Sequence, residues 1–166
     1  MHLAYIGIGS NLENPRKQIK KAIAAMKQLS HNGAIDCSAI YQSSPMAEES
    51  DLKNNQQSDY LNAVVRITTS LEPMPLLDAL QQIENLQGRI RNEKRWIART
   101  LDLDILLFDN QTINHPRLTV PHYGLKQRHF VIYPLADLDA NLVLPDGTTI
   151  KELLETCSSE GIRKID

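Results

Sequence analysis

Cysteines and long apolar runs are scarce in this sequence of 166 residues. Its only cysteines, Cys37 and Cys157, lie far apart and in neither CxxC nor Cys/His spacing, which argues against a zinc site or a disulfide framework. No apolar run approaches the roughly 20 residues that span a bilayer, and no basic leader precedes the short apolar run 3–8. We therefore expect reduced thiols, no membrane partner and, by default, a cytoplasmic location.

Aromatic residues are also few, and positive charge is not in excess. Aromatics make up 5% of the chain, the net charge is −2 and the pI is near 6.2. A surface built throughout to hold polyanions is therefore not expected, although a local basic site remains compatible with these values. Hydrophobic residues at 42% and charged residues at 23% are typical of a soluble globular protein, and the length suits one domain over residues 1–166.

The hydrophobic pattern predicts alternating strands and helices. Compact or alternating apolar stretches predict strands over 3–9, 35–41, 60–68 and 102–108. Helical periodicity predicts one helix beginning at Asn14-Pro15 and another over 72–87. Residues 112–114 are expected to return as a short hairpin on strand 102–108, 130–138 fits strand or helix, and 149–156 is expected to be a short terminal helix.

This order of elements predicts the fold class. A strand, helix, strand, strand, helix, strand sequence matches the split βαβ, ferredoxin-like arrangement. We therefore expect an α+β fold, with an antiparallel sheet, helices packed mainly on one face and functional loops over the site. The loop over 42–59 is longer than the usual connection of about 4–6 residues, as functional loops often are.

Positive charge is concentrated in one segment. Five basic residues within eleven positions face a single acidic residue, Glu93, and these are Arg89, Arg91, Lys94, Arg95 and Arg99. A polyanion site is the functional interpretation, and a solvated loop is the alternative.

Two carboxylates follow this segment at strand spacing. Asp102 and Asp104 are expected on one face of strand 102–108, with about 6.6 Å between them at the backbone. Leu101, Leu103 and Ile105 are expected to point into the core. Oxygen ligands of this kind suit Mg²⁺, which completes its octahedron with water and substrate phosphates. The alternative is an edge strand with a polar face.

Carboxylates beside arginines make up two halves of a phosphoryl-transfer site. The usual phosphate loops are missing, however, because no GxxxxGK[ST] occurs and the run 7–12 lacks the third glycine of a dinucleotide fingerprint. Any ATP would have to be held mainly by side chains.

Four segments then carry a specific resemblance. They are Gly9-Ser10-Asn11-Leu12, Asp59-Tyr60-Leu61-Asn62-Ala63, Arg95-Trp96 with 99–105 (RTLDLDI), and 117–123 (RLTVPHY). In this order they resemble the 6-hydroxymethyl-7,8-dihydropterin pyrophosphokinase family over most of the chain. The resemblance implies transfer of pyrophosphate from ATP to the pterin hydroxymethyl group in folate synthesis, by a monomer without nucleic acid.

The resemblance also implies the site residues. Asp102 and Asp104 would bind two Mg²⁺ ions, and Arg95 and Arg99 would act with them in catalysis. The nucleotide side would comprise Gln81, Glu84, Arg89, Arg91, Trp96, Ile105, Arg117, Thr119, His122, Tyr123 and Arg128. The pterin side would comprise Ser43, Ser44, Pro45, Met46, Tyr60, Asn62 and Phe130. The alternative for His122 is a packed surface histidine, and for Tyr60 and Phe130 it is ordinary core.

The chain departs from the family pattern in places. Ser44 stands where proline is typical, Ile97-Ala98 replaces Gly-Pro, and the stretch 47–58 is longer than in compact members. These changes affect loop closure rather than chemistry. No general base is obvious: Asp104 could accept the alcohol proton, or the metal could lower the pKa of the alcohol enough to make a base unnecessary.

Two functions from other classes stay open at this point. A ferredoxin-like RNA-binding module would stack bases on exposed aromatics, which are few here. A two-metal phosphohydrolase would use water as its nucleophile and would hydrolyse ATP without a pterin.

Overall fold

The computed structural model describes residues 1–11, 14–43, 60–87 and 101–165. Its main sheet is built around β1 (His2–Ser10), which pairs antiparallel with β4 (Tyr60–Thr69) on one side and β5 (Asp102–Phe108) on the other. The strand order is β5-β1-β4-β3-β8, with β3 at Tyr41–Ser43 and β8 at Ile162–Lys164. β2 (Ile35–Cys37) pairs antiparallel with β4, where Ile35 lies opposite Ile67.

One face of the sheet packs on two helices. Alternate residues such as Ile6, Val65 and Leu103 share a buried cluster with α1 (Pro15–Met26) and α3 (Pro73–Leu86). The predicted alternation of strand 60–68 is confirmed, because Ala63, Val65 and Ile67 all lie in this cluster. Asn14 precedes α1 as expected but makes no side-chain capping bond.

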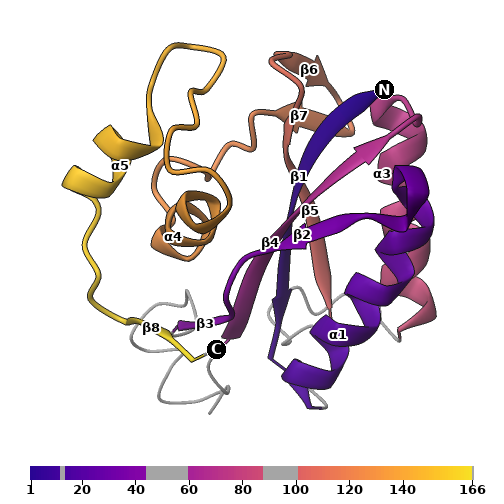
Figure 1. The fold of residues 1–166 in the computed structure, drawn as a ribbon, viewed down its shortest axis with the longest axis horizontal. Coiled ribbons are helices and arrows are strands. Elements are labelled where there is room, and N and C mark those ends of the chain that lie inside the picture. Colours follow the sequence, from indigo (N-terminus) through magenta and orange to yellow (C-terminus); the bar gives the residue numbers. More distant parts are fainter. Residues whose placement is uncertain (12–13, 44–59, 88–100, 166) are drawn as a thin grey trace.

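The opposite face carries a second helical layer. Tyr5, Val64 and Leu106 form another buried cluster with α4 (His129–Leu138) and α5 (Ile150–Thr156). Figure 1 shows α1 and α3 on one side of the sheet and α4 and α5 on the other. The α+β class with an antiparallel sheet is therefore observed, but the expectation that helices lie mainly on one face is wrong.

Several local expectations are also corrected. Residues 112–114 do not return onto β5: β6 (Ile113–His115) pairs instead with β7 (Leu118–Val120). The single strand expected over 35–41 is split into β2 and the first residue of β3. The segment 130–138 is a helix, and short 3-10 turns at Lys27–Leu29 and His31–Gly33 link α1 to β2.

Across the four described ranges, no helix combines the length and the apolar character needed to cross a bilayer.

Candidate active site

Strand register brings the two predicted halves of the site onto one row of the sheet. Asp102 of β5 lies opposite Gly9 of β1, and Gly9 lies opposite Asn62 of β4. Directly opposed residues present their side chains to the same face. Asp102, predicted to bind metal, and Asn62, predicted to bind the pterin, therefore face the same side, roughly 9.6 Å apart at the backbone, or two interstrand spacings.

Gly9, at the centre of this row, has no side chain to cover the sheet between Asp102 and Asn62. A Cβ built on Gly9 would lie 3.5 Å from Asn62 Oδ1 and 3.9 Å from Tyr60 Cδ1, within ordinary contact distance. Gly7 occupies the next position on the same face, opposite Asp104. A Cβ on Gly7 would meet the Leu106 side chain at 3.4 Å, so it is Gly9 that leaves space between Asp102 and Asn62 that a larger side chain would fill.

The two carboxylates predicted to bind metal lie on a well-anchored strand. Asp102 and Asp104 are half-buried, whereas Leu103 between them is turned into the core and is 4% exposed. Glu84 of α3 is itself buried, and its Oε2 accepts a hydrogen bond from the Leu103 N–H at 2.8 Å. In the part of the chain that the structure describes, no cluster of three or more His, Cys, Asp or Glu is suited to hold a metal. Paired carboxylates that need substrate oxygens to complete the shell fit Mg²⁺.

The pterin side is built on β3 and β4. Asn62 is buried, and its Nδ2 donates to Ser43 Oγ at 2.7 Å. With Nδ2 held in this way, Oδ1 is the atom beside the Gly9 opening. Tyr60 and Asn62 are two apart and so share a face, as predicted. Phe130, in the first turn of α4, is half-buried.

His122 lies beside the metal pair. Its N–H donates to the Leu106 carbonyl at 3.0 Å, which places it alongside β5, and its Nε2 lies 3.8 Å from Asp104 Oδ2. Nδ1 accepts from the Gly124 N–H at 3.1 Å, so the neutral ring carries its proton on Nε2. Burial lowers the pKa of His122 and Arg128 lowers it further, against an opposing effect of Asp102.

Arg128 lies between residues predicted for the nucleotide side and a residue predicted for the pterin side. Its guanidinium lies 5.3 Å from the Tyr123 ring centre and 5.7 Å from the Phe130 ring centre. The Tyr123 ring in turn stacks on His122 at 4.5 Å. Glycine at position 124 is required by this arrangement, because a Cβ there would lie 2.5 Å from Arg128 Nε.

Arg117 belongs to a second cluster on the nucleotide side. It donates to Gln81 Oε1 at 3.2 Å and to Asp78 Oδ1 at 2.6 Å. Two residues predicted from widely separated segments are thus in contact. Asp78 was not predicted, and an acidic residue one turn before Gln81 on helix 72–87 was the available signal. Thr119 is exposed on β7.

Two residues predicted on the nucleotide side, Ile105 and Glu84, have buried side chains. Ile105 is 2% exposed and lies in the core against α1 and α3. The alternation of the strand already placed its side chain there, and the assignment of Ile105 to the nucleotide side stays a prediction. Glu84 is 1% exposed, and its observed hydrogen bond is to β5.

The remaining predicted residues lie outside the described ranges. They are Ser44, Pro45, Met46, Arg89, Arg91, Arg95, Trp96 and Arg99. Their assignments stay predictions.

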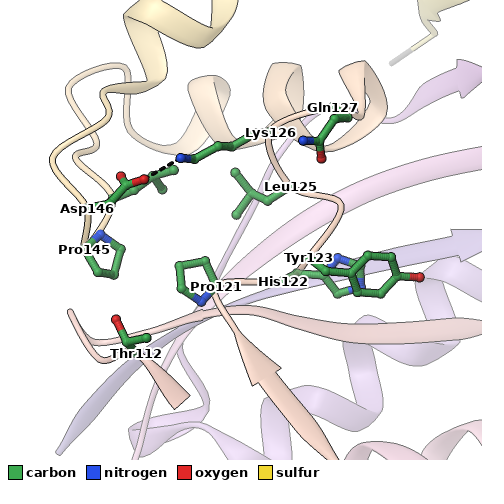
Figure 2. A pocket seen from close by; sticks show the side chains of 10 residues that line it. Thr112, Pro121, His122, Tyr123, Leu125, Lys126, Gln127, Pro145 and Asp146 are labelled. Atoms are coloured by element: carbon green, nitrogen blue, oxygen red, sulfur yellow. Dashed lines mark hydrogen bonds and ion pairs between the residues drawn. The ribbon is translucent and has the colours of Figure 1, made fainter. Parts of the chain in front are cut away.

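A cavity of about 290 Å³ adjoins the site. Figure 2 shows His122 and Tyr123 on one side of it, Pro121 and Leu125 along it, and Lys126 paired with Asp146 at the far side. Neither Asp102 nor Asp104 lines this cavity. The candidate site is therefore defined by Asp102, Gly9 and Asn62 on the sheet rather than by this cavity.

Comparison with known proteins gives consistent matches. Residues 5–140 match the model of the 7,8-dihydro-6-hydroxymethylpterin-pyrophosphokinase (HPPK) family. The chain is 45% identical to 2-amino-4-hydroxy-6-hydroxymethyldihydropteridine pyrophosphokinase of Haemophilus influenzae, covering 100% of this chain and 99% of that protein. It is 47% identical to the Pseudomonas aeruginosa protein of the same name, covering 97% of this chain and 95% of that protein.

Solved structures agree at the level of the fold. Wild-type Plasmodium falciparum HPPK-DHPS superposes with a TM-score of 0.73 at 14% identity, over 99% of this chain. The chain spans only 45% of that longer protein. The family model covers most of the chain, and the bacterial relatives match it almost from end to end. The chain therefore belongs to the 7,8-dihydro-6-hydroxymethylpterin-pyrophosphokinase family of enzymes.

Proposed function

We propose that this chain transfers pyrophosphate from ATP to the hydroxymethyl group of 6-hydroxymethyl-7,8-dihydropterin, giving AMP and the pterin diphosphate for folate synthesis. One observation carries the proposal: Asp102 and Asn62 share a row of the sheet on either side of Gly9. A metal-bound polyphosphate over the carboxylates and a pterin at the amide would meet above the glycine.

The metal side uses carboxylates that fit magnesium. Asp102 and Asp104 would hold two Mg²⁺ ions, each completed by ATP phosphate oxygens and water. When bound, such ions neutralise phosphate charge and orient the entering and leaving oxygens. Glu84 fixes the strand that presents the pair, through its bond to the Leu103 N–H.

The phosphate side uses donors and cations. The lowered pKa of His122 favours the neutral ring, which would offer Nε2–H, while Arg128 would supply a positive charge. Arg117 and Gln81 hold each other at the edge of this region. Arg89, Arg91, Arg95, Trp96 and Arg99 would complete it, with Arg95 and Arg99 stabilising charge that develops during transfer.

The pterin side matches a flat ligand rich in amide groups. Asn62 Oδ1 would accept a hydrogen bond from the pterin edge, because its Nδ2 is already bonded to Ser43. Tyr60 and Phe130 would stack on the ring faces, and residues 44–46 would close the edge.

The reaction is a substitution at the β-phosphorus. The pterin hydroxymethyl oxygen forms a bond to this phosphorus and gives up its proton to Asp104 or to water, and the bond to the oxygen bridging the α- and β-phosphorus breaks. AMP leaves with that electron pair. Positioning and charge stabilisation supply most of the rate in transfers of this kind.

The strand order β5-β1-β4-β3, with α1 and α3 on one face, supports a ferredoxin-like core for this enzyme. Residues 1–166 are proposed to form a single domain that acts as a monomer.

Phosphorus NMR of the products tests the proposal. ATP, Mg²⁺ and the pterin alcohol should give AMP and a pterin diphosphate in equal amounts. Formation of ADP and a pterin monophosphate would contradict attack at the β-phosphorus. Rapid loss of ATP without pterin would instead support a phosphohydrolase.

A further inference from the structure

Asp137, near the end of α4, contacts two other parts of the molecule. Its Oδ2 accepts hydrogen bonds from the Tyr41 hydroxyl at 2.8 Å and from the Ala39 N–H at 3.2 Å. Its Oδ1 lies 3.8 Å from Lys164 Nζ on β8. One carboxylate therefore joins α4, the segment entering β3, and the last strand of the sheet.

The helix and strand joined in this way carry opposite walls of the proposed pterin site. α4 begins with His129 and Phe130, so the helix that Asp137 ties down is the one that carries Phe130. β3 ends at Ser43, whose Oγ holds Asn62, and Tyr41 lies directly opposite Asn62 in the register. A shift of α4 along β3 would move Phe130 relative to Asn62.

β8 holds the outer edge of β3. It pairs Lys164 with Tyr41 and Ile162 with Ser43. Lys164 Nζ also lies 5.9 Å from the Tyr41 ring centre, which adds a cation–π contact to its pairing with Asp137. Because Tyr41 is bonded on one side to Asp137 and covered by Lys164, its ring has little freedom to move.

The Tyr41 hydroxyl also keeps its proton. Burial and the hydrogen bond to Asp137 both raise the pKa of Tyr41, so the hydroxyl remains a donor throughout the working range of pH. The hydroxyl is therefore available to donate to Asp137 across that range.

We propose that Asp137, held between Tyr41 and Lys164, is a positioning residue for the pterin side: it fixes Phe130 on α4 relative to Ser43 and Asn62. This inference rests on the proposed function, because it assigns the pterin to those residues. Asp137 touches neither substrate in this arrangement and acts only through the elements it joins.

Kinetics with full-length variants test the proposal. Asp137→Ala and Tyr41→Phe should each raise the KM for the pterin by about fivefold to tenfold, because a displaced Phe130 would lose part of its stacking on the pterin ring. The KM for ATP should rise less than the KM for the pterin, because Arg128 is the only described nucleotide-side residue next to α4, whereas Arg117, Thr119 and His122 lie on other elements. Asp137→Asn keeps an acceptor for Tyr41 and should recover most of the pterin affinity.

Control variants separate this effect from general loosening. Glu72→Gln removes a comparable exposed contact, to His2 at the other end of β1, and should leave both KM values unchanged. Should Asp137→Ala fail to fold, Tyr41→Phe still decides, since it deletes a single hydroxyl. Equal rises in both KM values would overturn the proposal, because they would indicate a loss of structure throughout.

Asn62→Ala and Phe130→Ala distinguish failure of the inference from failure of the proposed function. If they weaken pterin binding while Tyr41→Phe and Asp137→Ala bind as wild type, the positioning role is wrong and the site stands. If Asn62→Ala and Phe130→Ala also bind the pterin normally, the assignment of this face to the pterin is wrong.

Discussion

Glu84 accepts a hydrogen bond from the backbone N–H of Leu103, the residue between the two predicted metal ligands. The bond connects α3 to β5 across the core and fixes the rotation of the strand about its axis. That rotation decides which face Asp102 and Asp104 share.

Replacement of Glu84 by Ala should therefore destabilise the protein and disturb the metal pair. Leaving the Leu103 N–H without this acceptor should lower the free energy of unfolding by about 1–3 kcal/mol, as measured by urea titration. Glu84→Gln keeps an acceptor oxygen and should be milder. Normal stability with a much weakened affinity for ATP would instead show direct contact with the nucleotide.

Loss of either aspartate should abolish turnover without unfolding the chain. Asp102→Ala and Asp104→Ala each remove a ligand from a cluster that carries the triphosphate, and a loss of at least about a hundredfold in kcat should result. Asp102→Asn should fail as well, since a neutral amide binds a hard cation poorly. Both side chains are half-buried on the site face, so thermal melts should change little. Near-normal activity in both Ala variants would contradict the metal assignment.

A larger residue at position 9 should block the site while preserving the strand. Val is a good strand former, and a Cβ here meets its neighbours at no less than 3.5 Å. Gly9→Val should therefore fold, yet lower kcat/KM for the pterin by at least about tenfold, because it fills the space between Asp102 and Asn62. Thr68→Val, at an exposed position of β4, is the matched control and should be silent. Full activity in Gly9→Val would show that the substrates do not meet there.

The three central strands could be predicted from the sequence because compact or alternating apolar stretches carry their information locally. β5 matches the predicted range 102–108, with its aspartates on one face and Leu103 and Ile105 in the core. Placing Ile105 among the nucleotide contacts went against this pattern, and its side chain indeed lies on the other face.

Features that depend on distant contacts escaped prediction. β8 has only three residues, Ile162–Lys164, and exists because it pairs with β3 about 120 positions earlier. The helix α4 is apolar along most of its length and contains Pro134, so its periodicity favoured neither helix nor strand. The contacts of Arg117 with Asp78 and of Asp137 with Tyr41 arise only once these elements pack.

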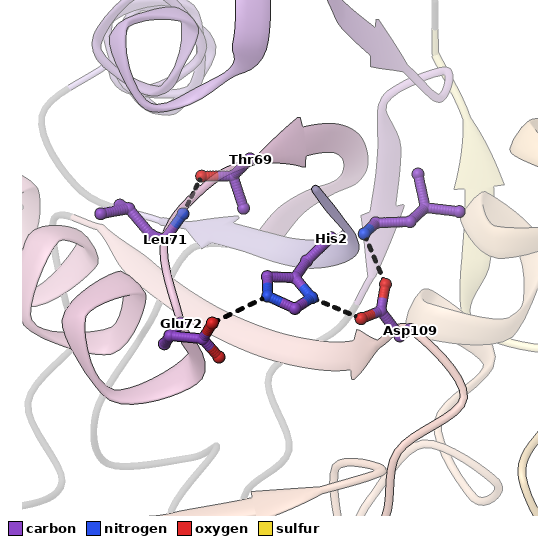
Figure 3. Close-up of polar contacts among 6 residues, drawn as sticks. His2, Thr69, Leu71, Glu72 and Asp109 are labelled. Carbon is purple, nitrogen blue, oxygen red and sulfur yellow. Dashed lines mark hydrogen bonds and ion pairs between the residues drawn. The ribbon is translucent and has the colours of Figure 1, made fainter.

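His2, at the end of β1 remote from the site, forms a cluster with Asp109 and Glu72. His2 Nδ1 lies 2.6 Å from Asp109 Oδ2 and Nε2 lies 3.1 Å from Glu72 Oε1, while Asp109 Oδ1 accepts from the Leu3 N–H (Figure 3). The hydrogen bonds to Asp109 and Glu72 raise the pKa of His2 above its ordinary value. Burial alone would raise the pKa of Asp109, but the bonds from Leu3 and His2 bring it below its ordinary value.

These shifts predict a pH-dependent contribution of His2 to stability. A raised folded-state pKa means that the folded chain holds a proton which the unfolded chain releases above about pH 6.5, so the stabilisation is complete below that pH and is lost as pH rises through the raised pKa. Because the pKa of Asp109 is lowered in the folded state, the contribution of Asp109 to stability persists down to pH values below about 4. His2→Gln should therefore lower the Tm relative to wild type most clearly between about pH 5 and 6.5, with the difference shrinking toward alkaline pH. His31→Gln, an exposed histidine outside this cluster, is the control and should show no such trend. A difference between His2→Gln and wild type that stays constant from pH 5 to pH 9 would show that the cluster contributes packing rather than a proton-linked contact.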